Sequence, residues 1–297
     1  MINKQRLARE DSGQTLLSVV SEREQERIMI RRAQARRRMI IATLSSVLVL
    51  GTLAVVIVSS PGWTVVKATF FDFSYGHQVL HLVVQGLFTN LELTLIAGVA
   101  IAAIAMGLAL ARTSQSAAMT PFRILATVYV DVFRGIPLLL VILLIGFGVP
   151  ALRIAGVTSN VTVLGTIAVI VTYSAYVAEV LRSGILSVHP SQRSAARSLG
   201  LTQSQTLRFV VLPQALKRVV PPLLNDLVAL LKDTGLVSIL GVTDAIRAAQ
   251  IEGSRTFNYT PYVVAAILFL LITVPLTRYT DHVLNRSIAR QNAQGSV

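Results

Sequence analysis

Long runs of residues without a charged side chain constrain this chain more than any other feature of its sequence. The first run, residues 39–58, contains 20 residues and no charge. A helix of this length crosses a hydrocarbon core of about 30 Å. A signal peptide is the competing interpretation, but 38 polar residues are long for the segment that precedes one, and no A-x-A site follows. The run therefore predicts a retained membrane-spanning helix.

Five further segments are similarly apolar, although the one that opens at Pro221 contains Asp226, Lys232 and Asp233. They are residues 93–111, an apolar segment 138–149 entered through a helix that begins near Pro121, residues 161–178, the segment that opens at Pro221 and Pro222, and residues 262–277. The composition agrees, because 53% hydrophobic and 14% charged residues, with a mean hydropathy of +0.66, are far from the values of a soluble globular protein. The sequence predicts an all-α integral membrane protein with about six transmembrane helices.

The distribution of basic residues predicts the orientation of these helices. In the six-span arrangement, 22 of the 27 Lys and Arg residues would lie on one side of the membrane. Such an excess is typical of the cytoplasmic side, so we expect both termini to be cytoplasmic in a multi-pass protein of the cell membrane. The net charge of +13 is then explained by topology and contact with anionic lipid, and nucleic acid is not an expected partner.

Residues 182–220 form a polar island between very apolar neighbours, and they carry local signals for two short helices. Ser191 can cap a first helix that ends before Gly200, because a Ser hydroxyl accepts from free N-terminal amides and Gly readily adopts the left-handed C-cap. Thr202 and Gln205 have capping-box spacing, and Pro213 limits how far the second helix runs unbroken. We call residues 182–220 the elbow.

One face of the first predicted elbow helix carries small and apolar side chains. Ala195, Ala196 and Leu199 are placed on this face by helical spacing, while Arg193 and Arg197 project elsewhere. An ordinary amphipathic connection between membrane helices explains this pattern as well as a specific docking surface does. The spacing alone leaves both interpretations open.

The order of residues in the elbow resembles a known loop. Gln192, Ala195, Ala196, Leu199 and Gly200, followed by the string LPQA at 212–215, are similar to the cytoplasmic "EAA" loop of ABC importer permeases. More narrowly, they resemble the permease family for polar amino acids such as histidine, glutamine, glutamate and arginine, whose transmembrane fold is MetI-like (ABC type I importer). In that family the loop implies a coupling helix that docks on the ATP-hydrolysing subunit. The family's Glu is Ser194 here, which puts any salt bridge of that Glu in doubt.

Three further strings resemble the same family. FRGIPLLL at 133–140 has Ile136 in place of Thr, and KDTGLVS at 232–238 has Gly235 in place of Ser. The string AYVAEVLR at 175–182 matches the family's A-Y-x-x-E-x-x-R, and Glu179 and Arg182, three residues apart, can pair on one helix face. The resemblance covers roughly residues 80–280 and leaves the first 38 residues unexplained. Together with the charge pattern, it predicts a basic cytoplasmic segment 1–38, a permease domain 39–285 with the coupling loop 182–220, and a tail 286–297.

Polar residues inside the predicted spans are candidates for a substrate path. They are Glu92, Asn225, Lys232, Asp233 and Thr234. Charged groups in an apolar run are expensive in lipid and are expected to face a wet cavity or other helices. Lys232 and Asp233 are adjacent, so they cannot face each other on a helix and each needs another partner. The alternative is that these residues hold the helices together through polar contacts and do not line a substrate path.

The sequence contains no motif for a chemical reaction. It has no G-x-x-x-x-G-K-[ST], H-E-x-x-H or G-x-S-x-G motif and no cysteine. His77 and His81 have i, i+4 spacing, but a third zinc ligand is not evident. We therefore expect no catalytic residue, metal or cofactor in this chain, and the resemblance implies that ATP is bound by a partner subunit.

The resemblance implies four partners: an ABC ATPase dimer, a second permease of the same or a paralogous sequence, an extracytoplasmic amino-acid-binding protein and membrane lipid. Glutamine or glutamate is the first expectation for the substrate. Two alternatives remain open. One is an ion-coupled secondary carrier that uses Glu92, Asp226 or Asp233, although no two halves with matching interrupted helices are evident. The other is a membrane scaffold whose elbow binds another cytoplasmic protein.

Overall fold

The computed structural model describes residues 27, 30 and 34–294, and every secondary-structure element in this part of the chain is a helix. The predicted all-α fold is confirmed for these residues. Contacts divide the chain into two units, residues 1–66 and 67–297, which we describe separately. The predicted basic segment 1–38 falls mostly outside the described residues, as do the last three residues of the tail 286–297.

The first unit contains the helix Gln34–Val58, which includes the predicted first span. Its 25 residues extend over about 37 Å at 1.5 Å per residue, which exceeds the thickness of a hydrocarbon core. Its large apolar side chains, such as Leu48 and Leu50, are exposed all round the helix. A helix that is apolar on every side is suited to lipid and not to water.

A long helix, α3 (Phe73–Thr113), follows the short helix α2 (Trp63–Phe70). The carboxylate of Asp72 caps α3 by accepting from the Tyr75 N–H at 3.0 Å. The 41 residues of α3 span about 60 Å, roughly twice the hydrocarbon thickness, so the predicted span 93–111 is its second half. The sequence prediction placed residues 59–86 in a mixed interfacial segment, whereas the cap starts the helix at Phe73.

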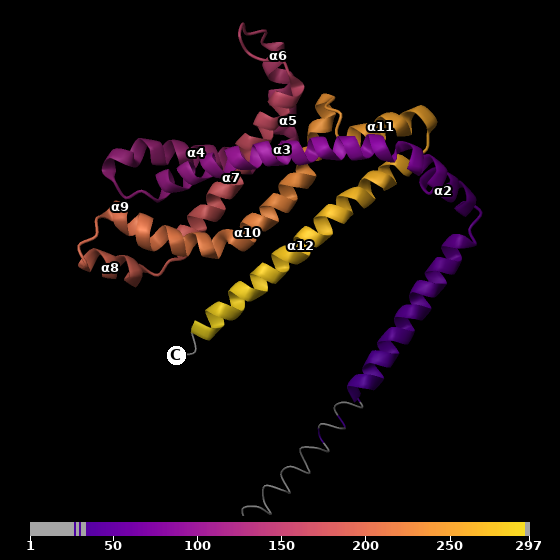
Figure 1. The fold of residues 1–297 in the computed structure, drawn as a ribbon, viewed down its shortest axis with the longest axis horizontal. Helices are drawn as coiled ribbons and strands as arrows, with labels where there is room; N and C mark the ends of the chain where they lie inside the picture. The colour runs from indigo at the N-terminus through magenta and orange to yellow at the C-terminus, as the bar shows by residue number, and fades with distance from the viewer. Residues whose placement is uncertain (1–26, 28–29, 31–33, 295–297) are drawn as a thin grey trace, which may run out of the picture. The chain divides into compact units, whose positions relative to one another are not determined.

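The next apolar segment is sharply broken, as the Gly and Pro residues at 135–137 predict. Helix α4 (Thr120–Gly135) is followed by α5 (Leu138–Leu143), a π-helical turn η2 (Leu144–Gly148) and α6 (Val149–Ala151), and the two halves meet at 104°. Ile136 is extended, with φ −99° and ψ 132°, because the ring of Pro137 disfavours a helical residue before it. In Figure 1, α5 and α6 point away from α4.

Helix α7 (Val161–Ser187) packs on α3, α4, α5 and α10 and forms the centre of the second unit (Figure 1). Alanines at its interface with α3 are fully or almost fully buried, and they include Ala97, Ala105, Ala109, Ala168, Ala175 and Ala178. Small side chains allow two backbones to approach closely, which replaces the hydrophobic effect as a source of packing in lipid.

The C-terminal part of the chain returns to this core. Helix α10 (Leu212–Asp233) begins within the elbow and is followed by the 3₁₀ helix η4 (Thr234–Leu240), α11 (Ala245–Thr256) and α12 (Thr260–Gln294). Helix α10 runs through Pro221 and Pro222, so the predicted fifth span is its continuation and not a new helix. Pro213 lies in the first turn of α10, where its missing N–H is not needed.

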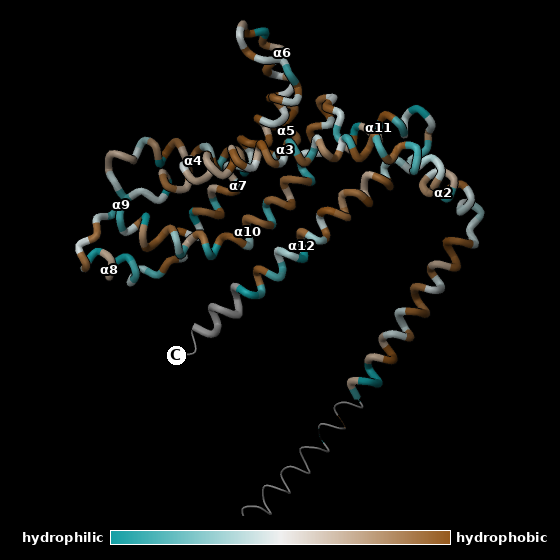
Figure 2. The backbone as a smooth tube through the Cα atoms, viewed as in Figure 1, coloured by the Kyte–Doolittle hydropathy of each residue, from teal (hydrophilic) through white to brown (hydrophobic). Residues whose placement is uncertain are grey.

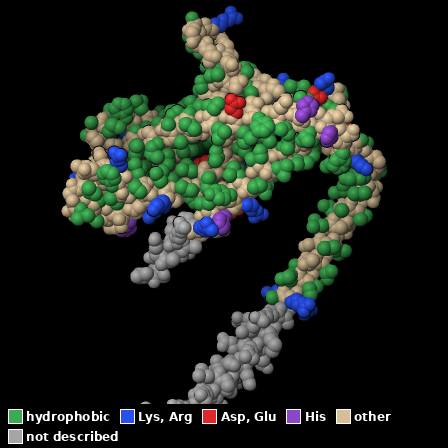
Figure 3. Space-filling model, in the orientation of Figure 1, with side chains coloured by type: hydrophobic (Ala, Val, Ile, Leu, Met, Phe, Trp, Pro, Cys, Tyr) green, Lys and Arg blue, Asp and Glu red, His purple; other side chains and the backbone are tan. Residues whose placement is uncertain are grey.

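Four described helices are long and apolar enough to cross a membrane, or five if the bent pair counts as one span. The fifth predicted segment, in α10, contains more charged residues and is not one of these helices. Figure 2 shows α12 largely hydrophobic before its C-terminal turns, and the region around α8 more hydrophilic. The face drawn in Figure 3 has a broad hydrophobic surface over α3 and its neighbours. Leu95 and Val99 are among the exposed apolar side chains of α3. These features define a multi-pass membrane protein.

Candidate functional site: the elbow and the polar contacts of the spans

The first elbow helix, α8 (Pro190–Ser198), is capped two residues before the predicted cap. His189 is the N-cap, and its Nδ1 accepts from the Ser191 N–H at 3.2 Å. The prediction that Ser191 caps the helix is wrong because Pro190, with its fixed φ, already occupies the first helical position. A backbone N–H can only donate, so this contact requires an unprotonated Nδ1 on His189.

The end of α8 has the predicted geometry. Gly200 is left-handed, with φ +82°, and the N–H of Leu201 reaches back to the Ala196 carbonyl at 3.2 Å. A Cβ added to Gly200 would meet no atom within 4 Å, so the backbone angle and not space requires glycine there. The capping box of Thr202 and Gln205 is also confirmed, with contacts of 3.3 and 2.8 Å that open α9 (Gln203–Gln205).

The two faces of α8 differ from the prediction in one respect. Ala196 is only 4% exposed, whereas Leu199 is 84% exposed and Ala195 is exposed as well. The prediction that Ala195, Ala196 and Leu199 fall on one face is therefore wrong for Ala196, because consecutive helical residues point about 100° apart. The exposed face instead consists of Gln192, Ala195 and Leu199, which have i, i+3, i+7 spacing.

Two arginines fasten the elbow to the end of α7. Arg193 of α8 donates to the Ile185 carbonyl at 2.6 Å, and Arg218 of α10 donates to the carbonyl of Ser187 and to its Oγ. The last carbonyls of a helix have no partner within the helix, and they carry a partial negative charge that attracts cations. Helix α8 also packs on the π-helical turn η3 (Thr206–Val211). A displacement of α8 would therefore be passed to α7 and α10.

A second cluster of charges lies at Glu179 of α7. The predicted pair with Arg182 is present, with an N–O distance of 2.5 Å, and Arg112 of α3 approaches the same carboxylate to 2.6 Å. Arg134, at the end of α4, is 3.8 Å away. One carboxylate thus joins three helices. The sequence predicts only the local contact, because Arg112 is 67 residues distant.

The five candidate path residues do not form one cluster in the described structure. Asp233 accepts a 2.7 Å hydrogen bond from the Tyr173 hydroxyl, which gives it a partner on α7. Thr234 is buried and accepts from Asn90 Nδ2 at 3.3 Å. The side chains of Glu92, Asn225 and Lys232 are exposed, and the last two lie seven residues apart on one face of α10. Their role in a path stays a prediction.

Two buried residues that the sequence prediction did not select join α3 to α11. Asn90 and Asp244 are both 0% exposed, and their side chains meet at 3.0 Å. The Asn90 carbonyl oxygen accepts from the Ala245 N–H at 3.2 Å, and Asp244 caps α11 through the Arg247 N–H. Burial raises the pKa of Asp244, while these hydrogen bonds act in the opposite direction. Neither residue has a local pattern that distinguishes it from an interfacial polar residue.

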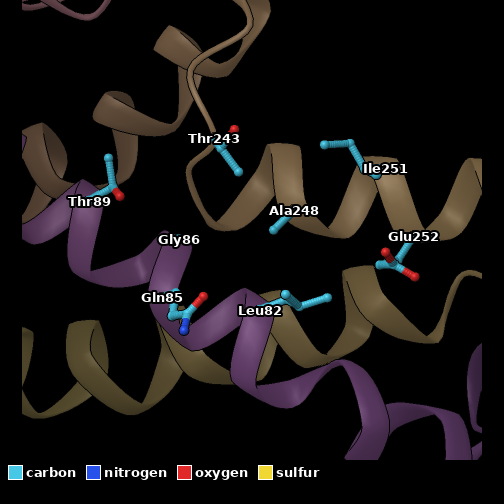
Figure 4. Close-up of a pocket in the computed structure, with 8 residues that line it drawn as sticks. All are labelled: Leu82, Gln85, Gly86, Thr89, Thr243, Ala248, Ile251 and Glu252. Atoms are coloured by element: carbon cyan, nitrogen blue, oxygen red, sulfur yellow. The ribbon is translucent and has the colours of Figure 1, made fainter.

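Figure 4 shows a small pocket of about 270 Å³ between α3 and α11. Gln85 and Thr89 lie on the α3 side, and Glu252 comes from α11. Glu252 Oε2 accepts from the Tyr75 hydroxyl at 3.2 Å, and Oε1 pairs with Arg255 at 3.0 Å. Residues 82–89 of α3 are more than 20 residues, or about 30 Å of helix, from its elbow end. The pocket and the elbow therefore lie at opposite ends of α3.

A chain with several apolar helices, a bent span and a helical elbow anchored to two of them is a multi-pass membrane protein. Residues 103–288 match the family model of the binding-protein-dependent transport system inner membrane component. The chain belongs to this family.

Relatives and a solved structure agree with this assignment. The chain is 34% identical over 196 residues to a protein of Rickettsia conorii named as a glutamine transport system permease, GlnP, which covers 66% of this chain and 88% of that protein. It is 30% identical over 207 residues to the arginine transport system permease protein ArtQ of Bacillus subtilis, with 69% and 92% covered. A crystal structure of an amino acid ABC transporter with histidines has a TM-score of 0.66 and 34% identity, and covers 72% of this chain and 98% of that one.

The N-cap of α8 gives a first testable prediction. We expect His189→Ala to weaken association with a docked ATPase by about two- to fivefold, since a lost cap costs roughly 1 kcal/mol of helix stability. His189→Asn is the control, because Asn is a favoured N-cap and should preserve binding. Co-purification of the ATPase with each variant measures the effect. Equal loss of ATPase binding in both variants would mean that His189 contributes to binding in some way other than by capping α8.

Proposed function

We propose that this chain is the permease subunit of an ABC importer for polar amino acids, with glutamine or glutamate as the first candidates. A separate ATPase dimer would dock on α8 and hydrolyse ATP. A second permease, identical or paralogous, would enclose the path, and an extracytoplasmic binding protein would deliver the substrate. Both termini would be cytoplasmic. The names of the relatives, which describe glutamine and arginine transport, support an amino-acid substrate.

The observation that carries this proposal is the combination of an exposed face on α8 with a rigid attachment behind it. Gln192, Ala195 and Leu199 present a small, partly apolar surface, while Arg193 holds the same helix to α7 at 2.6 Å. Closure of the ATPases would move α8 as a lever and pass the motion to α7 and α10. Such a rigid-body shift would switch the path between inward-facing and outward-facing states.

The exposed polar residues of α10 support a shared path. Asn225 and Lys232 lie on one face of α10, and leaving them in lipid would be costly. We propose that the second permease and water cover this face. An apolar groove of about 430 Å³ between α3, α7 and α10 lies beside it, and its wall includes Tyr173 and Asp226. The Oδ2 atom of Asp226 is buried without a partner among the described residues, and a buried carboxylate oxygen needs a donor, which a hydrated path would supply.

We do not propose the ion-coupled carrier, because the family to which the chain belongs depends on a binding protein. Uptake into proteoliposomes tests the proposal. The complete transporter should take up one or a few polar amino acids only when ATP is inside and the binding protein outside. Uptake driven by a proton or sodium gradient without ATP would refute it.

Asp233 gives a second prediction. We expect Asp233→Asn to lower uptake several-fold with assembly preserved, because it removes a charge while an amide oxygen can still accept from Tyr173. Tyr173→Phe is the complementary control. It removes the hydrogen bond between Tyr173 and Asp233 and leaves the charge of Asp233 in place. If Asp233 serves the path, only the first variant should reduce initial uptake rates. If Asp233→Asn takes up substrate at the wild-type rate, Asp233 is not part of the substrate path.

A further inference from the structure

A cavity of about 700 Å³ lies between the elbow and the far end of α3. One wall comes from α3 and the turn after it, from Gly107 to Ser116. The opposite wall comes from α8, α9 and η3, and includes Arg193, Arg197 and Thr206. The amides of Gln203 and Gln115 meet at 3.3 Å and connect the two walls. The cavity therefore lies between α8, which is anchored to α7, and α3, past which α8 would move during coupling.

The charged residues that line this cavity are both arginines, and no acidic residue lines it. Arg193 uses Nη2 for the Ile185 carbonyl, and Arg197 uses Nη1 for the Leu201 carbonyl at 2.8 Å. A guanidinium has five N–H donors, so each side chain keeps further donors. Two such groups without a facing carboxylate favour a planar or tetrahedral oxyanion.

A buried hydroxyl on the same wall has no partner. Thr206 is 5% exposed, and its Oγ1 forms no hydrogen bond among the described residues. Several other helical threonines donate to the carbonyl four residues earlier, as Thr113 does at 2.8 Å and Thr166 at 2.7 Å, although Thr172 of α7 also lacks a partner among the described residues. Thr206 is the first residue of the π-helical turn η3, and such turns occur frequently at functional sites. Its free hydroxyl is a further donor on the cavity wall.

The rest of the wall is mixed, with neutral polar side chains from the turn after α3 and from α9 and an apolar part beside the arginines. Leu110, Ile185, Leu207 and Val211 line it beside the two arginines. An apolar wall next to cationic groups is suited to an amphiphile whose charged group lies at a membrane surface. Basic pockets between helices on the cytoplasmic side commonly bind phosphate-containing lipid head groups.

We propose that this cavity binds a phosphate group, supplied by an anionic phospholipid of the cytoplasmic leaflet, through Arg193, Arg197 and Thr206. The choice of leaflet rests on the orientation given in the proposed function. A bound phosphate would connect the end of α3 to α8 and stiffen the elbow. Coupling between ATP hydrolysis and transport would then depend on anionic lipid.

Lipid retention by the purified, delipidated transporter tests this proposal. After phosphatidylglycerol is added back, native mass spectrometry should find one tightly retained molecule per permease chain. We expect at least fivefold weaker retention in Arg197→Gln, and normal retention in Arg208→Gln, which removes the same charge from an exposed position that does not line the cavity.

A second variant keeps the test independent of the arginines. Gly107 lines the cavity, and a Cβ added there would meet no atom within 4 Å, so Gly107→Phe should fill the space without a collision at the backbone. It should also abolish retention, whereas Gly98→Phe, equally unobstructed on the same helix, should not. Retention of the lipid by both Arg197→Gln and Gly107→Phe at the wild-type level would overturn the proposal.

A competition arm distinguishes the two sources of phosphate. Millimolar inorganic phosphate should leave the retained phosphatidylglycerol in place. Displacement of the lipid by inorganic phosphate would support the anion site and overturn its assignment to lipid. The measurement uses neither amino acid nor ATP, so a negative result would concern the cavity and leave the transport function to its own test.

Discussion

Gly200→Val should abolish docking of the ATPase while the chain still inserts in the membrane. Gly200 has φ +82°, and a β-branched residue in this region costs about 1–3 kcal/mol, which is enough to unwind the end of a nine-residue helix. Because an added Cβ meets no atom within 4 Å, the effect would come from the backbone angle alone. We expect at least a tenfold loss of ATPase in a pull-down with the permease.

Gly200→Asn is the matched control for this prediction. Asn tolerates the left-handed conformation better than any other residue with a side chain, so it should restore most of the binding. Normal pull-down of the ATPase by Gly200→Val would show that the C-cap of α8 does not shape the docking surface.

The second large effect is expected at Gly86, where α3 crosses the start of α11. A Cβ at this position would lie 2.4 Å from the Asp244 carbonyl carbon and 2.5 Å from the Ala245 nitrogen. These are backbone atoms that cannot rotate away, so Gly86→Ala must push α11 from α3 and strain the buried contact between Asn90 and Asp244. A destabilisation of about 1–3 kcal/mol corresponds to a fall in Tm of about 3–10 °C.

Gly98→Ala provides the comparison, because it makes the same change on the same helix in open space. Ala has a higher helix propensity than Gly, so this variant should keep or raise the Tm. Size-exclusion profiles of detergent-purified protein after heating measure both values. Equal Tm values for the two variants would contradict the close approach of α3 and α11.

Local signals allowed the elbow to be predicted from the sequence. Gly200 as a C-cap and Thr202 with Gln205 as a capping box depend on residues at most four apart, and both are present. One local error, Ser191 in place of His189, arose because an imidazole is not among the usual caps and Pro190 starts the helix early.

Contacts distant in the sequence could not be predicted in the same way. The pair of Glu179 with Arg182 follows from spacing, but Arg112 reaches the same carboxylate from 67 residues away. Asn90 meets Asp244 across 154 residues. No periodicity encodes such pairs. The full length of α3 was also missed, because its first half is interfacial in composition although it is helical.

The central claim is that α8 couples this permease to an ATPase, and substrate-stimulated ATP hydrolysis tests it most directly. Proteoliposomes would contain this chain, its co-purifying ATPase and the candidate binding protein, and the assay would be screened over polar amino acids. We predict that one or a few amino acids stimulate hydrolysis in the wild type and in Gly200→Asn, and that stimulation is lost in Gly200→Val. Full stimulation in Gly200→Val, or uptake that follows an imposed ion gradient when no ATPase co-purifies, would contradict the account.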